Sequence, residues 1–302
     1  MKKSNVVLEN FVEYNSGLGN QLFQLNYAHF LKNRFEKEFG MLRRKVPSRI
    51  DRPFDLDELL QFESTFPLPE IIDTHAIFRK RLGRIPYVRK FMYSNERSIN
   101  WISEPREFSF AKPTSPAAGK KNYYVGYFQN YEYVEEAYKF YAATLENFLS
   151  VKFYQAKSRL DYIEGKGILH IRRGDLLKPE CSGMGMLNFQ YYREAMIKLD
   201  IDPHRAVILT DDKSNVVRLA SQLGIDYIIG PDEMSAWEAL AVFAQSPQLV
   251  SANSTLSWWG AFIGKNNGNI AAYPSIWFQK WSPNPADSLH IPGQIMQESY
   301  FE

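Results

Sequence analysis

Gly167-Ile168-Leu169-His170-Ile171-Arg172-Arg173-Gly174-Asp175 is a short apolar run that ends in a cluster of charged and polar side chains. Residues 168–171 have the composition of a buried strand, and the glycine after the arginines indicates a turn. Adjacent guanidinium groups repel each other unless an anion lies beside them, and each presents planar N–H donors that match phosphate oxygens. Paired arginines are also common on solvated surfaces. Their position directly after a strand, where open α/β sheets bind ligands, favours a phosphate-bearing ligand.

The composition is that of a globular protein with room for two domains. The chain has 302 residues, of which 45% are hydrophobic and 23% are charged, so each of two domains could bury its own core. The net charge of +2 lacks the one-sided basic character of a nucleic-acid binder. Aromatic residues reach 15%, which slightly favours carbohydrate or nucleotide binding because aromatic rings stack on sugars and bases.

The number of cysteines and the lengths of the apolar runs indicate in which cellular compartment the protein is expected. Cys181 is the single cysteine, so no internal disulfide can form and a reducing compartment is the simplest expectation. No signal peptide is recognisable, and no stretch approaches the ~18 apolar residues that span a bilayer. These features predict a soluble cytoplasmic protein. Six basic residues between Arg79 and Lys90 indicate either a solvated helix face or a patch for peripheral contact with a membrane that carries a lipid-linked glycan.

The second half of the chain alternates between strand and helix patterns. Expected strands cover residues 168–171, 206–210, 225–229 and 248–251, and expected helices cover 189–199, 215–223, 235–244 and 255–263. This alternation predicts a parallel sheet with helices on both faces. In the first half we expect a strand at 6–14, a helix at 22–31, an aromatic strand at 123–128 and a helix at 133–149. The domains are expected to be 1–155 and 156–302, with the last residues packing back on the first domain.

Three further loops carry candidate functional groups. The turn at residues 15–21 contains Gly17 and Gly19 before a helix, but it lacks the third glycine of a dinucleotide-binding fingerprint. Asp211 and Asp212 follow an expected strand, where they serve either a ligand or the start of the next helix. Residues 251–260, Ser-Ala-Asn-Ser-Thr-Leu-Ser-Trp-Trp-Gly, place hydroxyl and amide groups at a helix N-terminus, an arrangement that suits phosphate.

One alternative is a metal site at Asp55 and Asp57. The Asp-Leu-Asp spacing resembles the two-carboxylate motif of another class of sugar transferase, but three residues are a weak signal. Acidic residues also suit a helix N-terminus, which is the expectation we favour here.

Four segments together resemble glycosyltransferase family 11, the α-1,2-fucosyltransferases. They are the stretch from His170 to Asp175 and the sequences Gly-Leu-Gly-Asn-Gln-Leu-Phe-Gln at 17–24, Leu-Thr-Asp-Asp at 209–212 and Asn-Ser-Thr-Leu-Ser-Trp-Trp-Gly-Ala at 253–261. They occur in the family's order, and residues 191–195 and 273–278 resemble two minor family blocks. Residues 40–120 carry no recognisable motif, and Ser16 stands where the family usually has a glycine.

The resemblance implies the GT-B architecture, with two Rossmann-like domains whose parallel sheets face each other across a cleft. It implies an acceptor-side N-terminal domain, a C-terminal domain that binds GDP-fucose, and catalysis without a metal ion. Arg172 would bind the donor pyrophosphate and act in catalysis with Asp175. The donor-binding residues would be Gly17, Gly19, Asn20, Gln21, His170, Arg172, Arg173, Asp175, Asp211, Asn253, Ser254 and Thr255.

The implied function is an inverting α-1,2-fucosyltransferase that uses GDP-fucose to modify a galactose-terminated glycan in cell-surface polysaccharide synthesis. A general base would help to deprotonate the acceptor hydroxyl. Asp175, Asp211 and Glu238 are candidates, and Asp175 is alternatively the ion-pair partner of Arg173. Two rivals stay open: a transferase that uses another nucleotide sugar, since a fold does not fix the substrate, and a non-catalytic nucleotide- or carbohydrate-binding protein.

Overall fold

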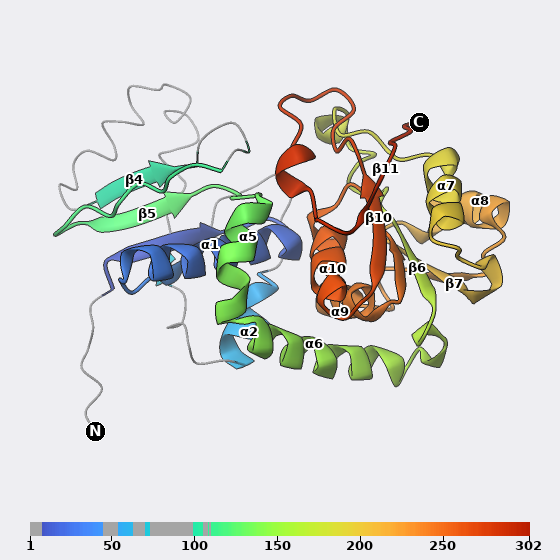
Figure 1. The fold of residues 1–302 in the computed structure, drawn as a ribbon, viewed down its shortest axis with the longest axis horizontal. Helices are drawn as coiled ribbons and strands as arrows, with labels where there is room; N and C mark the ends of the chain where they lie inside the picture. The colour runs from blue at the N-terminus through green and yellow to red at the C-terminus, as the bar shows by residue number, and fades with distance from the viewer. Residues whose placement is uncertain (1–7, 45–53, 63–69, 73–98, 105–107, 109) are drawn as a thin grey trace. The chain divides into compact units, whose positions relative to one another are not determined.

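The computed structural model describes residues 8–44, 54–62, 70–72, 99–104, 108 and 110–302 (Figure 1). The chain divides into two compact units, Met1–Ala143 and Thr144–Glu302, which we call the N-terminal and C-terminal units. The expected domain boundary at 155/156 falls inside helix α6 (Ala142–Lys157). The prediction of an α/β fold built on two Rossmann-like parallel sheets is confirmed.

The C-terminal unit contains a fully parallel sheet of six strands in the order β11-β10-β9-β6-β7-β8. Counted along this unit, the order is 6-5-4-1-2-3, which is the doubly wound order of dinucleotide-binding folds. The strands are β6 (Gly167–Ile171), β7 (Ala206–Thr210), β8 (Tyr227–Ile229), β9 (Gln248–Val250), β10 (Ile270–Pro274) and β11 (Ile295–Gln297). The last two were not predicted from the sequence.

Two pairs of helices cover opposite faces of this sheet (Figure 1). The helices are α7 (Phe189–Lys198), α8 (Lys213–Leu223), α9 (Ala236–Gln245) and α10 (Thr255–Asn266). Leu169 and Ile171 of β6 pack into one core cluster with α7 and α8. Because side chains alternate along a strand, His170 points to the other face, where its ring lies 4.9 Å from that of Phe243 on α9.

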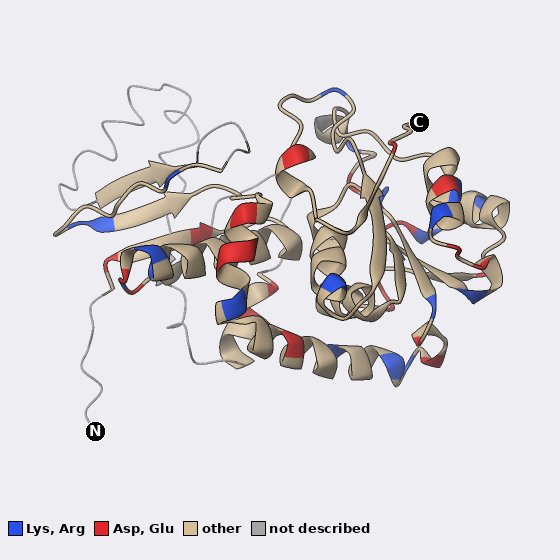
Figure 2. Cartoon of the chain, viewed as in Figure 1, with Lys and Arg blue, Asp and Glu red and all other residues tan. Residues whose placement is uncertain are grey.

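Helices α9 and α10 are almost free of charge because both lie against the sheet and against each other. Each carries one charged residue, Glu238 and Lys265 (Figure 2). Their close approach depends on Gly260, where an added Cβ would lie 2.3 Å from the Cβ of Phe243. No side-chain rotation can relieve that contact, so Gly260 allows the two helices to pack closely.

Replacement of Gly260 by alanine is therefore expected to lower the free energy of unfolding by about 1–3 kcal/mol, the usual range for overpacking. Gly264, one turn later on α10, is the matched control, since an added Cβ there would meet its nearest neighbours at 3.2–3.4 Å. Alanine at Gly264 gains helix propensity of up to ~1 kcal/mol, which offsets the tight approach to the Ala244 carbonyl, so it should cost much less stability than alanine at Gly260. Denaturant unfolding of both variants is the measurement, and equal stability of the two would refute the packing argument.

The N-terminal unit is built on a second parallel sheet in the order β3-β2-β1-β5-β4. Its described elements are β1 (Asn10–Tyr14), α1 (Leu18–Phe35), β2 (Gly40–Arg44), α2 (Leu56–Phe62), β3 (Glu70–Ile72), β4 (Ile99–Ser103), β5 (Lys121–Val125) and α5 (Tyr131–Ala137). The expected helix at 133–149 is wrong as one element, because a 3-10 turn at Tyr138–Phe140 separates α5 from α6.

Helix α1 starts at Leu18, earlier than the expected residue 22, and it is buried on nearly all sides. Three buried amide side chains along it bond to groups outside the helix. Gln21 donates to the Ser16 carbonyl and accepts from the Leu56 N–H. Gln24 and Asn26 likewise bond to loop and helix groups of this unit. These amides satisfy buried polar groups that would otherwise cost about 1–3 kcal/mol each.

Candidate functional site

The candidate site of the C-terminal unit lies at the carboxyl ends of β6 and β9. These neighbouring parallel strands mark the point where the strand order reverses, which is the place where open α/β sheets bind ligands. Arg172 follows β6, and Ser251 follows β9. The long-range pairing of the sheet therefore brings two of the sequence-predicted loops together.

Arg172 is held in a fixed orientation by three hydrogen bonds. Its Nε and one terminal nitrogen donate to the two carboxylate oxygens of Asp175 at 3.0 and 2.7 Å. The other terminal nitrogen donates to the Asn253 carbonyl at 2.9 Å. The Asp175 side chain is only 10% exposed and that of Arg172 is 20% exposed. Asp175 thus pairs with Arg172, so the alternative pairing with Arg173 is wrong.

Arg173 points to a different partner. Its two terminal nitrogens bond to the carboxylate of Glu302 in a bidentate ion pair. The Arg173 side chain is 11% exposed, and its buried Nε has no hydrogen-bond partner in the described part of the chain. The two adjacent arginines therefore engage two different carboxylates.

Asp211, at the end of β7, fixes the loop that carries both arginines. Its Oδ1 accepts the backbone N–H groups of Arg173 at 2.7 Å and of Gly174 at 2.9 Å. An added Cβ at Gly174 would lie 3.1 Å from the Asp211 carbonyl oxygen, so glycine permits this approach. Asp212 is the N-cap of α8, where its carboxylate accepts the Asn215 N–H, as the capping alternative predicted. The bond from the Asn215 side chain is the main cause that lowers the pKa of Asp212; burial, the second-largest effect, opposes it but is outweighed with the help of the Asn215 N–H and Ser214.

His170 is buried at 8% exposure, and its Nδ1 lies 2.8 Å from Ser257 Oγ. Burial is the main cause that lowers the pKa of His170 to about 4. Among nearby charges, Asp211 and Asp175 raise this pKa and Arg172 lowers it further. The imidazole is therefore neutral at physiological pH.

The loop after β9 uses its polar groups in more than one way. The Asn253 amide donates to the carbonyls of Gly185 and Trp277, each at 3.1 Å, and the residue is 1% exposed. Ser254 is the N-cap of α10 and accepts the Leu256 N–H. Thr255 begins α10. Asn253 thus organises neighbouring loops, while the start of α10 lies next to the carbonyl that orients Arg172.

Glu238, the third candidate base, has structural partners. It completes a capping box with Ser235 at the start of α9 and forms an ion pair with Arg159 at 2.7 Å. Burial acts to raise the pKa of Glu238, but the bonds from Ser235 and Arg159 outweigh it and lower that pKa overall.

The four candidates of the N-terminal glycine turn lie at the start of α1. Gly17 is the N-cap, and Gly19 is buried in the first turn. The side-chain Oδ1 of Asn20 accepts from the Gln129 side-chain amide at 2.9 Å. The Gln21 side chain is fully buried with its amide bonded as described above. At Gln21 the sequence signal thus corresponds to an internal cross-link of the N-terminal unit.

The alternative metal site has a different explanation. Asp57 accepts from the Tyr14 hydroxyl at 2.5 Å and pairs with Arg43, so its carboxylate is neutralised by an arginine. Among the described residues, no group of three or more His, Cys, Asp or Glu side chains could hold a metal ion. The basic residues 79–90 lie outside the described residues. In the described ranges, no helix is both long and apolar enough to cross a membrane.

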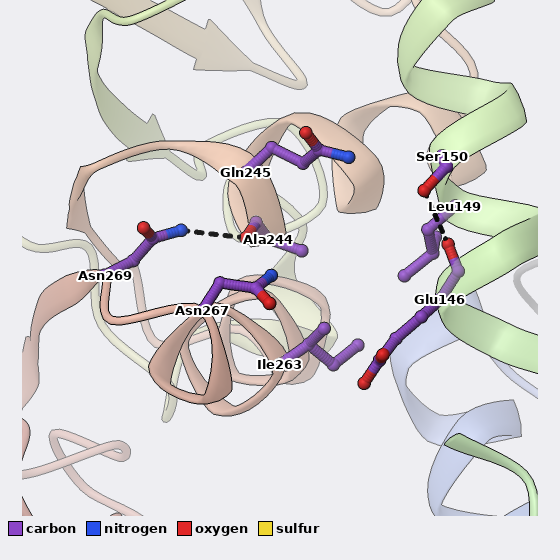
Figure 3. A pocket seen from close by; sticks show the side chains of 8 residues that line it. All are labelled: Glu146, Leu149, Ser150, Ala244, Gln245, Ile263, Asn267 and Asn269. Carbon is purple, nitrogen blue, oxygen red and sulfur yellow. Dashed lines mark hydrogen bonds between the residues drawn. The ribbon is translucent and has the colours of Figure 1, made fainter. Parts of the chain in front are cut away.

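A separate pocket of about 360 Å³ lies in the C-terminal unit between α6 and the ends of α9 and α10 (Figure 3). Helix α9 ends at Gln245, just before β9 begins, so this pocket is at the amino-terminal edge of the sheet. Its polar groups are partly used internally, since Asn269 donates to the Ala244 carbonyl and Ser150 to that of Glu146 (Figure 3). It lies on the opposite edge of the sheet from Arg172.

Sequence reasoning missed four residues that support the site. The hydroxyls of Tyr191 and Tyr192 on α7 donate to the carbonyls of Ser251 and His170, which fixes the backbone at both strand ends. Ser257 contacts His170, and Glu302 contacts Arg173. The two tyrosines lie in a block that resembles the family. No local pattern indicates Glu302, which is 129 positions from its partner.

Comparison with known proteins gives one curated relative and several solved structures. No family model matches the chain. Over 115 residues it is 30% identical to the O-antigen biosynthesis glycosyltransferase WbnK of Escherichia coli, a match that covers 36% of this chain and 38% of that protein. Similar structures include the fucosyltransferase NodZ from Bradyrhizobium (TM-score 0.45, 12% identity, 85% of this chain and 94% of that one). Another is the E. coli heptosyltransferase WaaC with ADP (TM-score 0.47, 13% identity, 96% and 93%).

Proposed function

We propose that this protein is a glycosyltransferase of the GT-B type that transfers fucose from GDP-fucose to a glycan. The observation that carries the proposal is the fixed guanidinium of Arg172 at the strand-order reversal of the C-terminal sheet. A guanidinium has five N–H groups, and three of them are used by Asp175 and Asn253. The remaining hydrogens, one on each terminal nitrogen, can bind a diphosphate oxygen.

The chemistry requires a preorganised cation at this point. Transfer of a sugar from a nucleoside diphosphate breaks the C1–O bond, so negative charge grows on the departing phosphate. Arg172 is already oriented before the ligand arrives, and one such preorganised donor is typically worth ~10²–10³ in rate. The N-terminal end of α10, a helix of 12 residues, adds backbone N–H groups that favour an anion.

The acceptor and the linkage are proposed from the resemblance of this chain to known glycosyltransferases. The motifs that resemble glycosyltransferase family 11 support inverting α-1,2 transfer to a galactose-terminated glycan. The partial match to an O-antigen glycosyltransferase supports a role in the synthesis of a cell-surface polysaccharide. The donor loops would be those at 170–175 and 251–255, with Asp211 holding the first of them.

Among the three candidate bases, the contacts favour Asp211. Both carboxylate oxygens of Asp175 are bonded to Arg172, and Glu238 is bonded to Arg159 and Ser235. Asp211 uses Oδ1 for two backbone N–H groups, and its Oδ2 has no hydrogen-bond partner in the described part of the chain. We assign Asp211 as the base that accepts the hydroxyl proton.

Incubation with GDP-fucose and a panel of galactose-terminated glycans should yield GDP and an α-1,2-fucosylated product, identified by mass spectrometry and NMR. A chelator should leave the rate unchanged, because the protein's own cation stabilises the leaving group. Turnover with a uridine diphosphate sugar alone would establish the rival donor. Binding of GDP without any transfer would establish the non-catalytic rival, and activity restored only by Mg²⁺ or Mn²⁺ would refute metal independence.

A further inference from the structure

A buried chain of three polar side chains connects β9, α10 and β6. Ser251 Oγ donates to Ser257 Oγ at 2.8 Å, and Ser257 Oγ lies 2.8 Å from His170 Nδ1. Both serines have 0% exposure, so water does not compete for these bonds. The chain joins the ends of the two strands that flank the candidate site.

The distances favour one direction for the hydrogen bonds. The single hydrogen of Ser251 Oγ can go to Ser257 Oγ at 2.8 Å or to the Ala252 carbonyl at 3.0 Å, and the shorter bond is the better one. Ser257 Oγ then accepts from Ser251, so its own hydrogen goes either to His170 Nδ1 at 2.8 Å or to the Ser254 carbonyl at 3.4 Å. The bond at 2.8 Å is much the better one, since hydroxyl donors prefer about 2.7–2.8 Å. Nδ1 of His170 then accepts, and in a neutral imidazole the proton lies on Nε2.

A neutral donor suits this position better than a second cation. The side chain of Arg172 already supplies the positive charge, and a protonated His170 two residues away would be repelled by it. Phe243 packs against the imidazole ring, and its apolar surface disfavours a charged ring.

We propose that Ser257, itself held by Ser251, is a positioning residue that fixes His170 in the Nε2–H tautomer. The neutral imidazole then offers one N–H group to an anionic oxygen of the ligand that binds Arg172. The identity of that oxygen as part of a nucleoside diphosphate rests on the function proposed above. The tautomer itself follows from the contacts of this chain alone.

The tautomer can be observed directly by two-bond ¹H–¹⁵N NMR of the protein labelled with ¹⁵N-histidine. The signal of His170, identified by its loss in His170→Gln, should show a protonated Nε2 and an unprotonated Nδ1. Besides Arg172, the charged groups that act on His170 are Asp175 and Asp211. The ring should stay neutral down to about pH 5, because burial lowers its pKa to about 4. Ser257→Ala should shift His170 to a mixture of tautomers.

Ligand affinity tests the second half of the proposal. GDP binding, measured by calorimetry, should weaken by about five- to tenfold in Ser257→Ala, the scale of one hydrogen bond. His170→Gln, whose amide nitrogen can replace Nε2, should retain more affinity than His170→Asn. Ser246→Ala is the matched control, because this buried serine bonds to the carbonyls of Lys166 and Gln248 at the other edge of the sheet. It should change neither the His170 spectrum nor GDP binding.

A wild-type spectrum with the proton on Nδ1 would overturn the tautomer assignment. An unchanged spectrum and unchanged GDP affinity in folded Ser257→Ala would overturn the positioning role. Failure of the wild type to bind GDP, together with the expected spectrum, would instead refute the donor in the proposed function and with it the ligand of His170. Thermal unfolding of each variant separates these results from a loss of folding.

Discussion

Replacement of Arg172 by lysine is expected to reduce kcat with GDP-fucose by about 10²–10³-fold, the typical cost of losing one preorganised transition-state donor. Lysine keeps the positive charge but loses the planar set of donors. It cannot bond to both oxygens of Asp175 and to the Asn253 carbonyl while it also binds a phosphate. The fold should persist, because the core of the C-terminal unit does not include this side chain. Steady-state kinetics and thermal unfolding are the measurements.

Arg159 provides a matched control for this substitution. It also bonds to a carboxylate, that of Glu238, and to a backbone carbonyl, that of Gln155. Its side chain is 50% exposed, and it lies outside the candidate site. Arg159→Lys should therefore keep normal kcat. Normal turnover by Arg172→Lys, or an equal loss in both variants, would show that Arg172 does not stabilise the leaving group.

The sequence predicted the strands of the C-terminal sheet wherever strand and helix patterns alternate within a short stretch of the chain. The run at 167–171 is apolar and ends in a turn, and the loops after β7 and β9 contain helix-capping residues, so local chemistry was sufficient there. Strands β10 and β11 were missed in a segment that was not resolved into elements. Strand β11 has only three residues and depends on pairing with β10 for its stability.

The sequence could not predict which carboxylate each arginine of the site bonds to, because these pairs depend on contacts between distant parts of the chain. The sequence contains two adjacent arginines that look equivalent, yet Arg172 pairs with a carboxylate three residues away and Arg173 with one at position 302. The amides of α1 show the same limit. Gln21 and Gln24 belong to a segment that resembles a ligand-binding motif, but both bond to backbone groups of the protein. Gln21 bonds to Ser16 and Leu56, and Gln24 bonds to Asn15 and Gly126. A family resemblance therefore indicates which residues matter without separating binding from support.

Arg173 shows most clearly that a motif residue can have a supporting role. Its ion pair with Glu302 holds the last residue of the chain against the C-terminal unit. Within the same unit, the Glu302 N–H also donates to the Met186 carbonyl, and Phe301 forms a bridge with Leu187. The terminal nitrogens of Arg173 are both bonded to Glu302. We therefore expect Arg173 mainly to hold this segment, although the sequence motif marks it as a donor-binding residue.

A double-mutant cycle of Arg173→Lys and Glu302→Gln tests this division of tasks. The pair is partly buried, so we expect each variant to lose about 1–2 kcal/mol of unfolding free energy, between the values for exposed and buried pairs. The double variant should lose less than the sum, because residues in direct contact couple. GDP affinity should change far less than in Arg172→Lys. Glu298→Gln is the control, since this exposed carboxylate of the same segment bonds to Tyr300 rather than to an arginine.

The direction of any change in GDP affinity decides between two tasks for Arg173. A diphosphate that takes over the arginine would have to displace Glu302, so Glu302→Gln would then tighten GDP binding and Arg173→Lys would weaken it strongly. If Arg173 only holds the terminal segment, both variants have a lower free energy of unfolding than the wild type, and both bind GDP nearly as the wild type does. The second pattern is the expected one, because the Arg173 side chain is 11% exposed and both of its terminal nitrogens are already bonded to the protein.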